Sequence, residues 1–339
     1  MDYYSIVVLL IIIINNLIGN CLADWDSWWT YEGISGPDFW GRLNPKWSHC
    51  NKGRRQSPID INPDLLLFDP GLAPVLLNGD HVSGKLVNTG RMITLKINVD
   101  QSAVLSSGPL SYQYTLSNIT LHFGRENNRG SEHTINGVQF PGELQLYAYN
   151  SQLYSNWSEA QHEANGLAAI SVLISHSKSS NQANSQLKHM THALKNITQR
   201  GDSQWLSSLS IQELMPTLKH YITYEGSLTQ PACHETVQWI VLNKPIYMSA
   251  HQFYLLRNTL KSDGHGDNYR PVQPLNHRSI RSNIDNAANQ EGNDVKTGDT
   301  TIGEHSYKKV SCSMERSMSY KAQLVIEIVS KNQLPPFCQ

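Results

Sequence analysis

Two short segments of the chain carry polar side chains in a pattern that a β-strand would bring onto one face. In the first segment, strand alternation places Asn118, Thr120 and His122 together, and in the second it gives Gln145 the same inward position. An imidazole is a strong zinc ligand, whereas a neutral hydroxyl or amide oxygen suits this borderline-soft ion poorly. The pattern therefore provides one good metal ligand, at His122.

Period-2 alternation of apolar and polar residues predicts the strands that would position these side chains. Apolar residues alternate from Ile93 to Val99, and strand-like patterns also cover residues 118–124, 143–149, 170–174 and 237–242. Helical patterns are fewer and shorter, and they cover residues 185–197, 210–218 and 249–260. Many strands with few short helices predict a mixed, mainly β fold, built on a large central twisted β-sheet with peripheral short helices.

The composition is that of a globular protein without charge bias. The chain has 339 residues, of which 39% are hydrophobic, and a formal net charge of -1. It can bury a large core, and its charge favours neither nucleic acid nor an anionic membrane as a partner.

Residues 1–23 have the pattern of a secretory signal peptide. An apolar stretch from Ile6 to Ile14 is followed by a polar break at Asn15, and Ala23 precedes the first acidic residue of the next segment. The stretch is shorter than the ~20 apolar residues that a membrane span needs, and no later segment is long enough either. We expect cleavage near Ala23 and a secreted, extracellular mature chain without a membrane span; an uncleaved anchor is the alternative.

The composition changes again near residue 283, which predicts one domain over residues 24–283. Residues 284–339 are predicted to form a flexible polar tail, because residues 285–309 are rich in Asn, Asp, Gly, Thr and Lys. An apolar stretch at residues 322–329 fits a strand or a short amphipathic helix.

Longer motifs run from Trp28 to Asn283. They include Gly36-Pro37, Arg55-Gln-Ser-Pro-Ile-Asp-Ile61, Gly130-Ser-Glu-His-Thr134, Tyr224-Glu-Gly-Ser-Leu-Thr-Gln-Pro231 and Asn268-Tyr-Arg-Pro-Val-Gln-Pro-Leu275. Each alone is a weak signal, but together they are specific, and the segment that they cover resembles the α-carbonic anhydrases. The resemblance implies a large twisted sheet with a metal site at the bottom of a conical cleft.

In that family, three histidines hold the zinc ion that carries the reactive hydroxide. The resemblance aligns their positions with Thr120, His122 and Gln145, so one ligand remains. Loss of even an outer partner of a ligand costs roughly 10 to 100-fold in affinity or activity, so loss of two ligands should cost at least roughly 10⁴-fold. We therefore expect no cofactor, no zinc at this site and no catalysis.

At neighbouring positions too, residues that active members of the family use for catalysis are replaced. Arg91 stands where active members usually carry the histidine that shuttles protons, and a guanidinium does not release a proton near neutral pH. Tyr147 replaces a small aliphatic residue of the carbon dioxide pocket. Glu132 and Thr229 match the acid–hydroxyl pair that orients the zinc hydroxide, and Glu143 matches a residue that buttresses a ligand histidine. These last three residues support either residual activity or buried structural hydrogen bonds.

Four cysteines remain after removal of the signal segment, and sequence alone allows three pairings. The resemblance selects one of them, because Cys50 and Cys233 match the positions that secreted members of the family join by a disulfide. Cys312 and Cys338 then either pair with each other, or Cys338 stays available for a disulfide to another protein.

Three Asn-x-Ser/Thr sequons, at Asn118, Asn156 and Asn196, are predicted N-glycosylation sites. Strand parity places Asn118 on the face that bears Thr120 and His122, so a glycan there would project into or over the former active-site cleft. The alternative is an unmodified asparagine that lines a polar cleft.

The chain resembles the secreted, acatalytic carbonic anhydrase-related proteins of types X and XI in three features. These are the single remaining ligand, the cysteine pair and the sequon at Asn156. Thr120 departs from the basic residue expected at the first ligand position of that branch. The resemblance implies an extracellular binding module of the nervous system, with neurexin-type synaptic receptors as partners. The alternatives are a weak residual zinc-dependent carbonate dehydratase or esterase working through His122 and Thr229, and a structural matrix protein.

Overall fold

The computed structural model describes residues 28–179, 181–259 and 266–285. The predicted signal segment, most of the predicted tail, Cys312 and Cys338 lie outside the described residues. The predicted domain boundaries therefore stay predictions.

The described chain is mainly β, as predicted. Its strands are β1 (Asp60–Ile61), β2 (Leu67–Phe68), β3 (Val75–Asn78), β4 (His81–Asn88), β5 (Ile93–Ile97), β6 (Val104–Ser107), β7 (Tyr114–Phe123), β8 (Thr134–Ile135), β9 (Gly142–Asn150), β10 (Leu167–His176), β11 (Ser203–Ser210), β12 (Tyr221–Gly226), β13 (Val237–Leu242), β14 (Ile246–Met248) and β15 (Arg281–Ser282). Its α-helices are α2 (Trp40–Leu43), α3 (His49–Lys52), α4 (Trp157–Ala160), α5 (Ser185–Ala193), α6 (Ile211–Leu214) and α7 (Ala250–Thr259). Short 3-10 helices are η2 (Gly33–Ser35), η3 (Pro45–Trp47), η4 (Pro63–Leu65), η5 (Val99–Gln101) and η6 (Leu194–Asn196).

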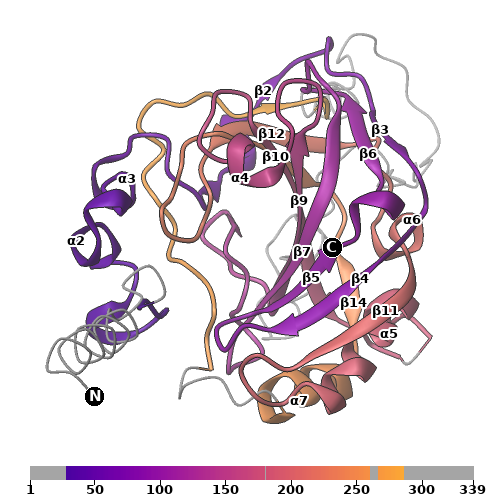
Figure 1. Ribbon diagram of the computed structural model, residues 1–339. Helices are drawn as coiled ribbons and strands as arrows, with labels where there is room; N and C mark the ends of the chain where they lie inside the picture. Colours follow the sequence, from indigo (N-terminus) through magenta and orange to yellow (C-terminus); the bar gives the residue numbers. More distant parts are fainter. Residues whose placement is uncertain (1–27, 180, 260–265, 286–339) are drawn as a thin grey trace, which may run out of the picture.

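One large mixed sheet organises the fold. It contains 13 strands, and its main path runs β11-β4-β5-β7-β9-β10-β13-β12-β15-β2. Strand β14 pairs with β10, and β6 joins β3 to β7. Figure 1 shows the long strands β7 and β9 near the centre and short helices at the periphery, with α2 and α3 on one side and α5 and α7 at the lower end. This is the predicted architecture.

Both faces of the central strands are covered, so β9 is buried along its whole length. Leu144, Leu146 and Ala148 pack into the larger of the two main hydrophobic clusters. Tyr147 and Tyr149 point to the other face and pack into the second cluster. Since side chains alternate along a strand, Glu143 and Gln145 share the face of these tyrosines. The polar residues therefore lie on the side of the sheet away from the larger core.

Two predicted elements are shorter than their sequence patterns. The alternation beyond Ile97 does not continue as a strand, because the Asn98 side chain accepts a hydrogen bond from the backbone N–H of Asp100 and starts a 3-10 turn. Val99 is consequently 63% exposed. Helix α6 ends at Leu214, not at residue 218, because Pro216 disfavours the helical conformation for the residue before it.

The pattern over residues 185–197 is confirmed as α5 followed by η6. The side-chain oxygen of Asn184 accepts hydrogen bonds from the backbone N–H groups of Gln186 and Leu187, which satisfies two free donors at the helix start. Among the described residues, no helix is long and apolar enough to cross a membrane.

Candidate functional site

The predicted polar segments lie in two adjacent antiparallel strands, β7 and β9. Their register places Thr120 opposite Gln145 and His122 opposite Glu143. Opposite residues of an antiparallel pair share a face, so the four side chains point to one side of the sheet. The exposed fraction is 3% for Thr120 and 0% for the other three. The structure thus brings these side chains together out of contact with bulk water.

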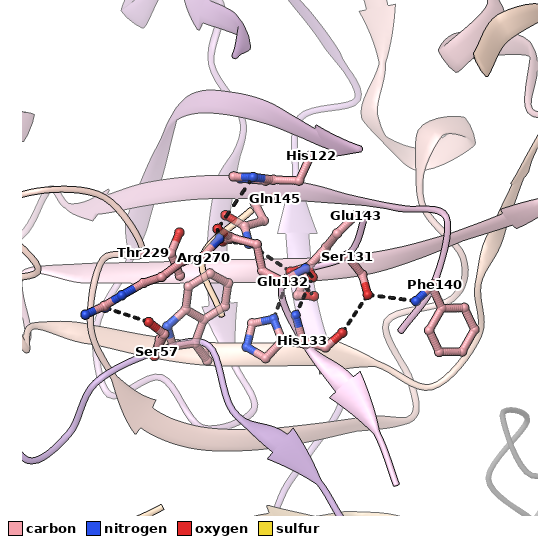
Figure 2. Close-up of polar contacts among 12 residues, drawn as sticks. Ser57, His122, Ser131, Glu132, His133, Phe140, Glu143, Gln145, Thr229 and Arg270 are labelled. Atoms are coloured by element: carbon pink, nitrogen blue, oxygen red, sulfur yellow. Dashed lines mark hydrogen bonds and ion pairs between the residues drawn. The ribbon is translucent and has the colours of Figure 1, made fainter. Parts of the chain in front are cut away.

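The side-chain amide of Gln145 makes three buried hydrogen bonds. Its Nε2 donates to Glu132 Oε2 and to Glu143 Oε1, both at 2.8 Å, and its Oε1 accepts from the Tyr147 hydroxyl at 2.7 Å. Figure 2 shows the amide between the two carboxylates. Ionised carboxylates only accept hydrogen bonds, so the NH₂ group has to face them. Gln145, which the resemblance aligns with the third zinc ligand, therefore donates hydrogen bonds to both carboxylates.

Glu143 is the centre of this polar network. Its Oε2 accepts from the backbone N–H groups of Glu132 at 2.9 Å and His133 at 2.8 Å. Its Oε1 accepts from His133 Nδ1 and from the Ser171 hydroxyl, each at 2.8 Å, in addition to Gln145. Five donors thus hold one buried carboxylate, which favours its ionised form.

The pKa of Glu143 reflects this environment. Burial raises the pKa, but the charge and the hydrogen bond of His133 and the hydrogen bond of Gln145 outweigh it and lower the pKa from 4.5 to about 2. Because the folded-state pKa is below the unfolded one, the carboxylate stabilises the fold above pH ~4.5, and this contribution is lost as the pH falls toward 2. We expect this group to remove about 3 kcal/mol from the free energy of unfolding over that range, measured by urea unfolding at each pH.

Two variants isolate this contribution. In Glu143→Gln, the free energy of unfolding at pH 7 should fall and its dependence on pH below 5 should become flatter, because the titrating group is gone. Asp38 is exposed, so Asp38→Asn should keep the wild-type slope. If the free energy of unfolding depended on pH equally in Glu143→Gln and Asp38→Asn, Glu143 would not be the group that titrates.

The segment that carries Glu132 packs closely against the backbone of Pro141. Gly130 has φ +146°, and a Cβ on it would lie 2.2 Å from the carbonyl oxygen of Pro141. Only glycine fits this position without displacing backbone. Next to it, the Ser131 hydroxyl donates to the carbonyl of His133 at 2.7 Å and accepts from the Phe140 N–H at 2.9 Å. These contacts direct the Glu132 carboxylate into the network.

His122 is anchored on one side of its ring. Its Nδ1 lies 2.7 Å from the carbonyl oxygen of Asn268 and 3.6 Å from Glu132 Oε1. A carbonyl only accepts, so Nδ1 carries the proton that forms this bond. Nε2 of His122 and the hydroxyl of Thr120 are both buried and have no hydrogen-bond partner among the described residues.

Comparison with known proteins agrees with this fold. Residues 35–284 match the family model described as eukaryotic-type carbonic anhydrase. The chain belongs to this family. A Caenorhabditis elegans protein named "Putative carbonic anhydrase-like protein 2" is 39% identical over 273 residues, which cover 77% of this chain and 80% of the relative. The family resemblance inferred from the motifs is therefore confirmed.

The donor set does not fit the zinc ion that this family implies. Gln145 is aligned with one ligand position but donates to two carboxylates, and Thr120 is aligned with another but supplies only a neutral hydroxyl. Within the described part of the chain, no group of three or more His, Cys, Asp or Glu residues is arranged to hold a metal ion. The expectation that zinc is absent stays a prediction, and we derive no reaction step through a metal.

Tyr147, Thr229 and Glu132, which the resemblance also aligns with family functions, are buried beside Gln145. Tyr147 is 2% exposed, and its hydroxyl lies 3.4 Å from the Thr229 hydroxyl. Glu132 accepts from the backbone N–H of Arg270 at 2.9 Å as well as from Gln145. Burial and the Glu132 charge both raise the pKa of Tyr147 well above its usual value, so the phenol keeps its proton and remains a donor.

A cleft of about 300 Å³ opens above this buried network. Thr120 and Tyr147 line it from the sheet, and Arg91 lines it from the connection between β4 and β5. The Arg91 Nε donates to the carbonyl of Trp29 at 2.6 Å, and its guanidinium lies 4.5 Å from the centre of the Trp29 ring. Arg91 thus lies against a tryptophan at the cleft wall, and this arrangement offers no group that exchanges protons near neutral pH.

Sequence reasoning assigned no site role to several buried residues of the network. Arg270 is 1% exposed and donates to Gln56, to the carbonyl of Ser57 and to the carbonyl of Cys50. Burial lowers its pKa to about 10, so it stays charged near neutral pH. His133 Nε2 lies 2.6 Å from the Tyr224 hydroxyl. Arg270, His133, Tyr224 and Asn268 all lie in family motifs quoted above, which was the only signal that could have singled them out.

Cys50 and Cys233 form a disulfide, in the pairing that the resemblance implied. Of the predicted glycosylation sites, Asn156 caps α4 and Asn196 ends η6, and both are exposed. Asn118 is partly buried and lines the cleft. Glycosylation of all three stays a prediction.

Proposed function

We propose that this chain is a catalytically inactive, secreted member of the carbonic anhydrase family that acts as an extracellular binding module. The observation that carries this proposal is the bonding of Gln145. A residue aligned with a zinc ligand has become a donor between Glu132 and Glu143, and its oxygen is engaged by Tyr147. Gln145, Glu132, Glu143 and Tyr147 thereby bond to one another without a metal, which is what a fold retained for binding would need.

The extracellular location rests on two features. The sequence has the pattern of a secretory signal in residues 1–23. The Cys50–Cys233 disulfide suits an oxidising compartment. The resemblance to the acatalytic secreted branch further points to a protein partner on the cell surface, of the neurexin type, and to neither nucleic acid nor a lipid bilayer.

The first test is the zinc content of the secreted, dialysed protein, measured by elemental mass spectrometry beside an active family member treated identically. We expect a zinc-to-protein ratio near zero, because two of the three aligned ligand positions cannot bind the ion tightly. The same preparation should bind cells that display a neurexin-type receptor and not matched cells without it. A ratio near one would contradict the loss of the metal site, and equal binding to both cell lines would contradict the choice of partner.

The alternative is a residual hydratase or esterase, and the unpartnered Nε2 of His122 is the feature that favours it. His122 is 0% exposed, so this nitrogen could act as a base only toward a small substrate that passed from the cleft into the buried network. A rate above buffer that disappears in both His122→Ala and Thr229→Ala would support it. A rate that survives both changes would exclude this site as its source.

A further inference from the structure

Asn118 combines an acceptor sequence for N-glycosylation with a place inside the cleft. It is the asparagine of the sequon Asn118-Ile-Thr120, and both Asn118 and Thr120 line the cleft of about 300 Å³. In β7 it lies opposite Lys96 of β5 on one side and Tyr147 of β9 on the other. A group attached to the Asn118 side chain would therefore begin between cleft walls and not on an outer surface.

The cleft has room for a sugar at this position. Its volume of about 300 Å³ equals that of about ten liquid waters at ~30 Å³ each, which is more than a single hexosamine ring needs. The only hydrogen bond of the Asn118 Nδ2 among the described residues joins it to the neighbouring Ser117 hydroxyl at 3.2 Å. A glycosylated Nδ2 keeps one N–H, so this contact can persist.

The side chains that line the cleft could also bind a sugar. Trp157 is partly exposed and provides a flat apolar surface, on which the C–H groups of a pyranose ring can pack. Gln161 and Gln230 provide side-chain amides that can bond to sugar hydroxyls. The Thr120 hydroxyl lies two residues further along the same strand face, is buried, and has no partner among the described residues. A buried hydroxyl without a partner is costly, and a sugar hydroxyl or acetamido group would satisfy it.

We propose that Asn118 carries an N-glycan whose first sugar occupies the cleft and closes it to other small molecules. In the reaction, the Nδ2 of Asn118 bonds to C1 of the first N-acetylglucosamine of a lipid-pyrophosphate-linked oligosaccharide; the lipid pyrophosphate leaves, and Nδ2 loses one proton. The oligosaccharide is transferred before the chain folds, so the later burial of the strand does not prevent modification of Asn118. The inference rests on the secretory route that forms part of the proposed function.

The experiment uses the full chain secreted from eukaryotic cells and treated with peptide-N-glycosidase F, either native or denatured, in heavy-oxygen water. Peptide mass spectrometry then reports each released site, because the asparagine becomes a labelled aspartate. We expect release from the exposed Asn156 and Asn196 in the native protein, and release from Asn118 only after denaturation. The sugar in the cleft should shield the bond that the enzyme cuts.

Each other outcome is informative. An unmodified Asn118 beside glycosylated Asn156 or Asn196 would overturn this inference and leave the secretory proposal intact. Release from native Asn118 at the rate of the other two sites would show a glycan that points out of the cleft, which also overturns it. No glycan at any of the three sites would overturn this inference and count against the secretory route as well.

A matched pair of variants separates the glycan from the fold. Thr120→Ser keeps the sequon, whereas Thr120→Ala removes it together with a hydroxyl that has no partner among the described residues, so both should fold. We expect the intact mass of the Thr120→Ser protein to exceed that of Thr120→Ala by one glycan. Equal glycan masses in the two folded variants would refute glycosylation at Asn118.

Discussion

Removal of the Cys50–Cys233 disulfide is expected to lower the free energy of unfolding by about 5 kcal/mol in the chain-entropy model. The bond joins residues 183 positions apart, so it removes much of the freedom of the unfolded chain. Both cysteines are buried, and their backbone carbonyls accept hydrogen bonds from Arg270 and Gln56, respectively. The disulfide thus ties the segment around α3 to the loop after β12 at the point where the buried Arg270 is bonded.

The measurement is denaturant unfolding of Cys50→Ala/Cys233→Ala beside the wild type, with and without reductant. The double variant avoids a lone thiol that could form wrong disulfides. With reductant, the wild type and the double variant should unfold at the same denaturant concentration, whereas without reductant the wild type should be the more stable of the two. A loss of less than about 1 kcal/mol would mean that the unfolded chain is already constrained without the bond.

Thr120→His combined with Gln145→His is expected to raise zinc affinity by at least roughly 10⁴-fold. The two strands already place these positions beside His122, and the unpartnered Nε2 of His122 is available as a ligand. Glu143 also remains to accept a hydrogen bond from a histidine at position 145, which would orient that ring. The bound ion should bring the ratio to about one zinc per chain in the four-coordinate geometry that zinc prefers.

The control is Thr120→Ala combined with Gln145→Ala, which changes the same positions without adding ligands and should stay free of zinc. Elemental mass spectrometry of the dialysed proteins gives the ratio, and calorimetric titration gives the affinity. A folded double-histidine variant that binds no zinc would show that something other than the two missing ligands prevents zinc binding. Addition of Tyr147→Val would then test whether the Tyr147 ring and its bond to position 145 cause it.

The main elements could be read from the sequence because they depend on local rules. Strand alternation was enough to place Thr120 and His122 on one face, and β7 has that form. The alternating apolar residues of β9 likewise marked the side chains that pack into the larger core, although both faces of that strand are buried. The errors at Val99 and at the end of α6 arose where a side-chain cap and a proline ended an apolar pattern.

The sequence by itself determined that His122 is the only imidazole among the three positions that the family resemblance aligns with zinc ligands, because ligand chemistry follows from residue type. Only the tertiary structure decided what Gln145 does instead. Its bonds to Glu132 and Tyr147 depend on the segment at Gly130 and on the neighbouring strand face, which come together through the fold. Arg270 illustrates the same limit, since the partners of its side chain lie more than 200 residues away along the chain. Hydrogen bonds between such distant residues follow no local period, so no sequence pattern reveals them.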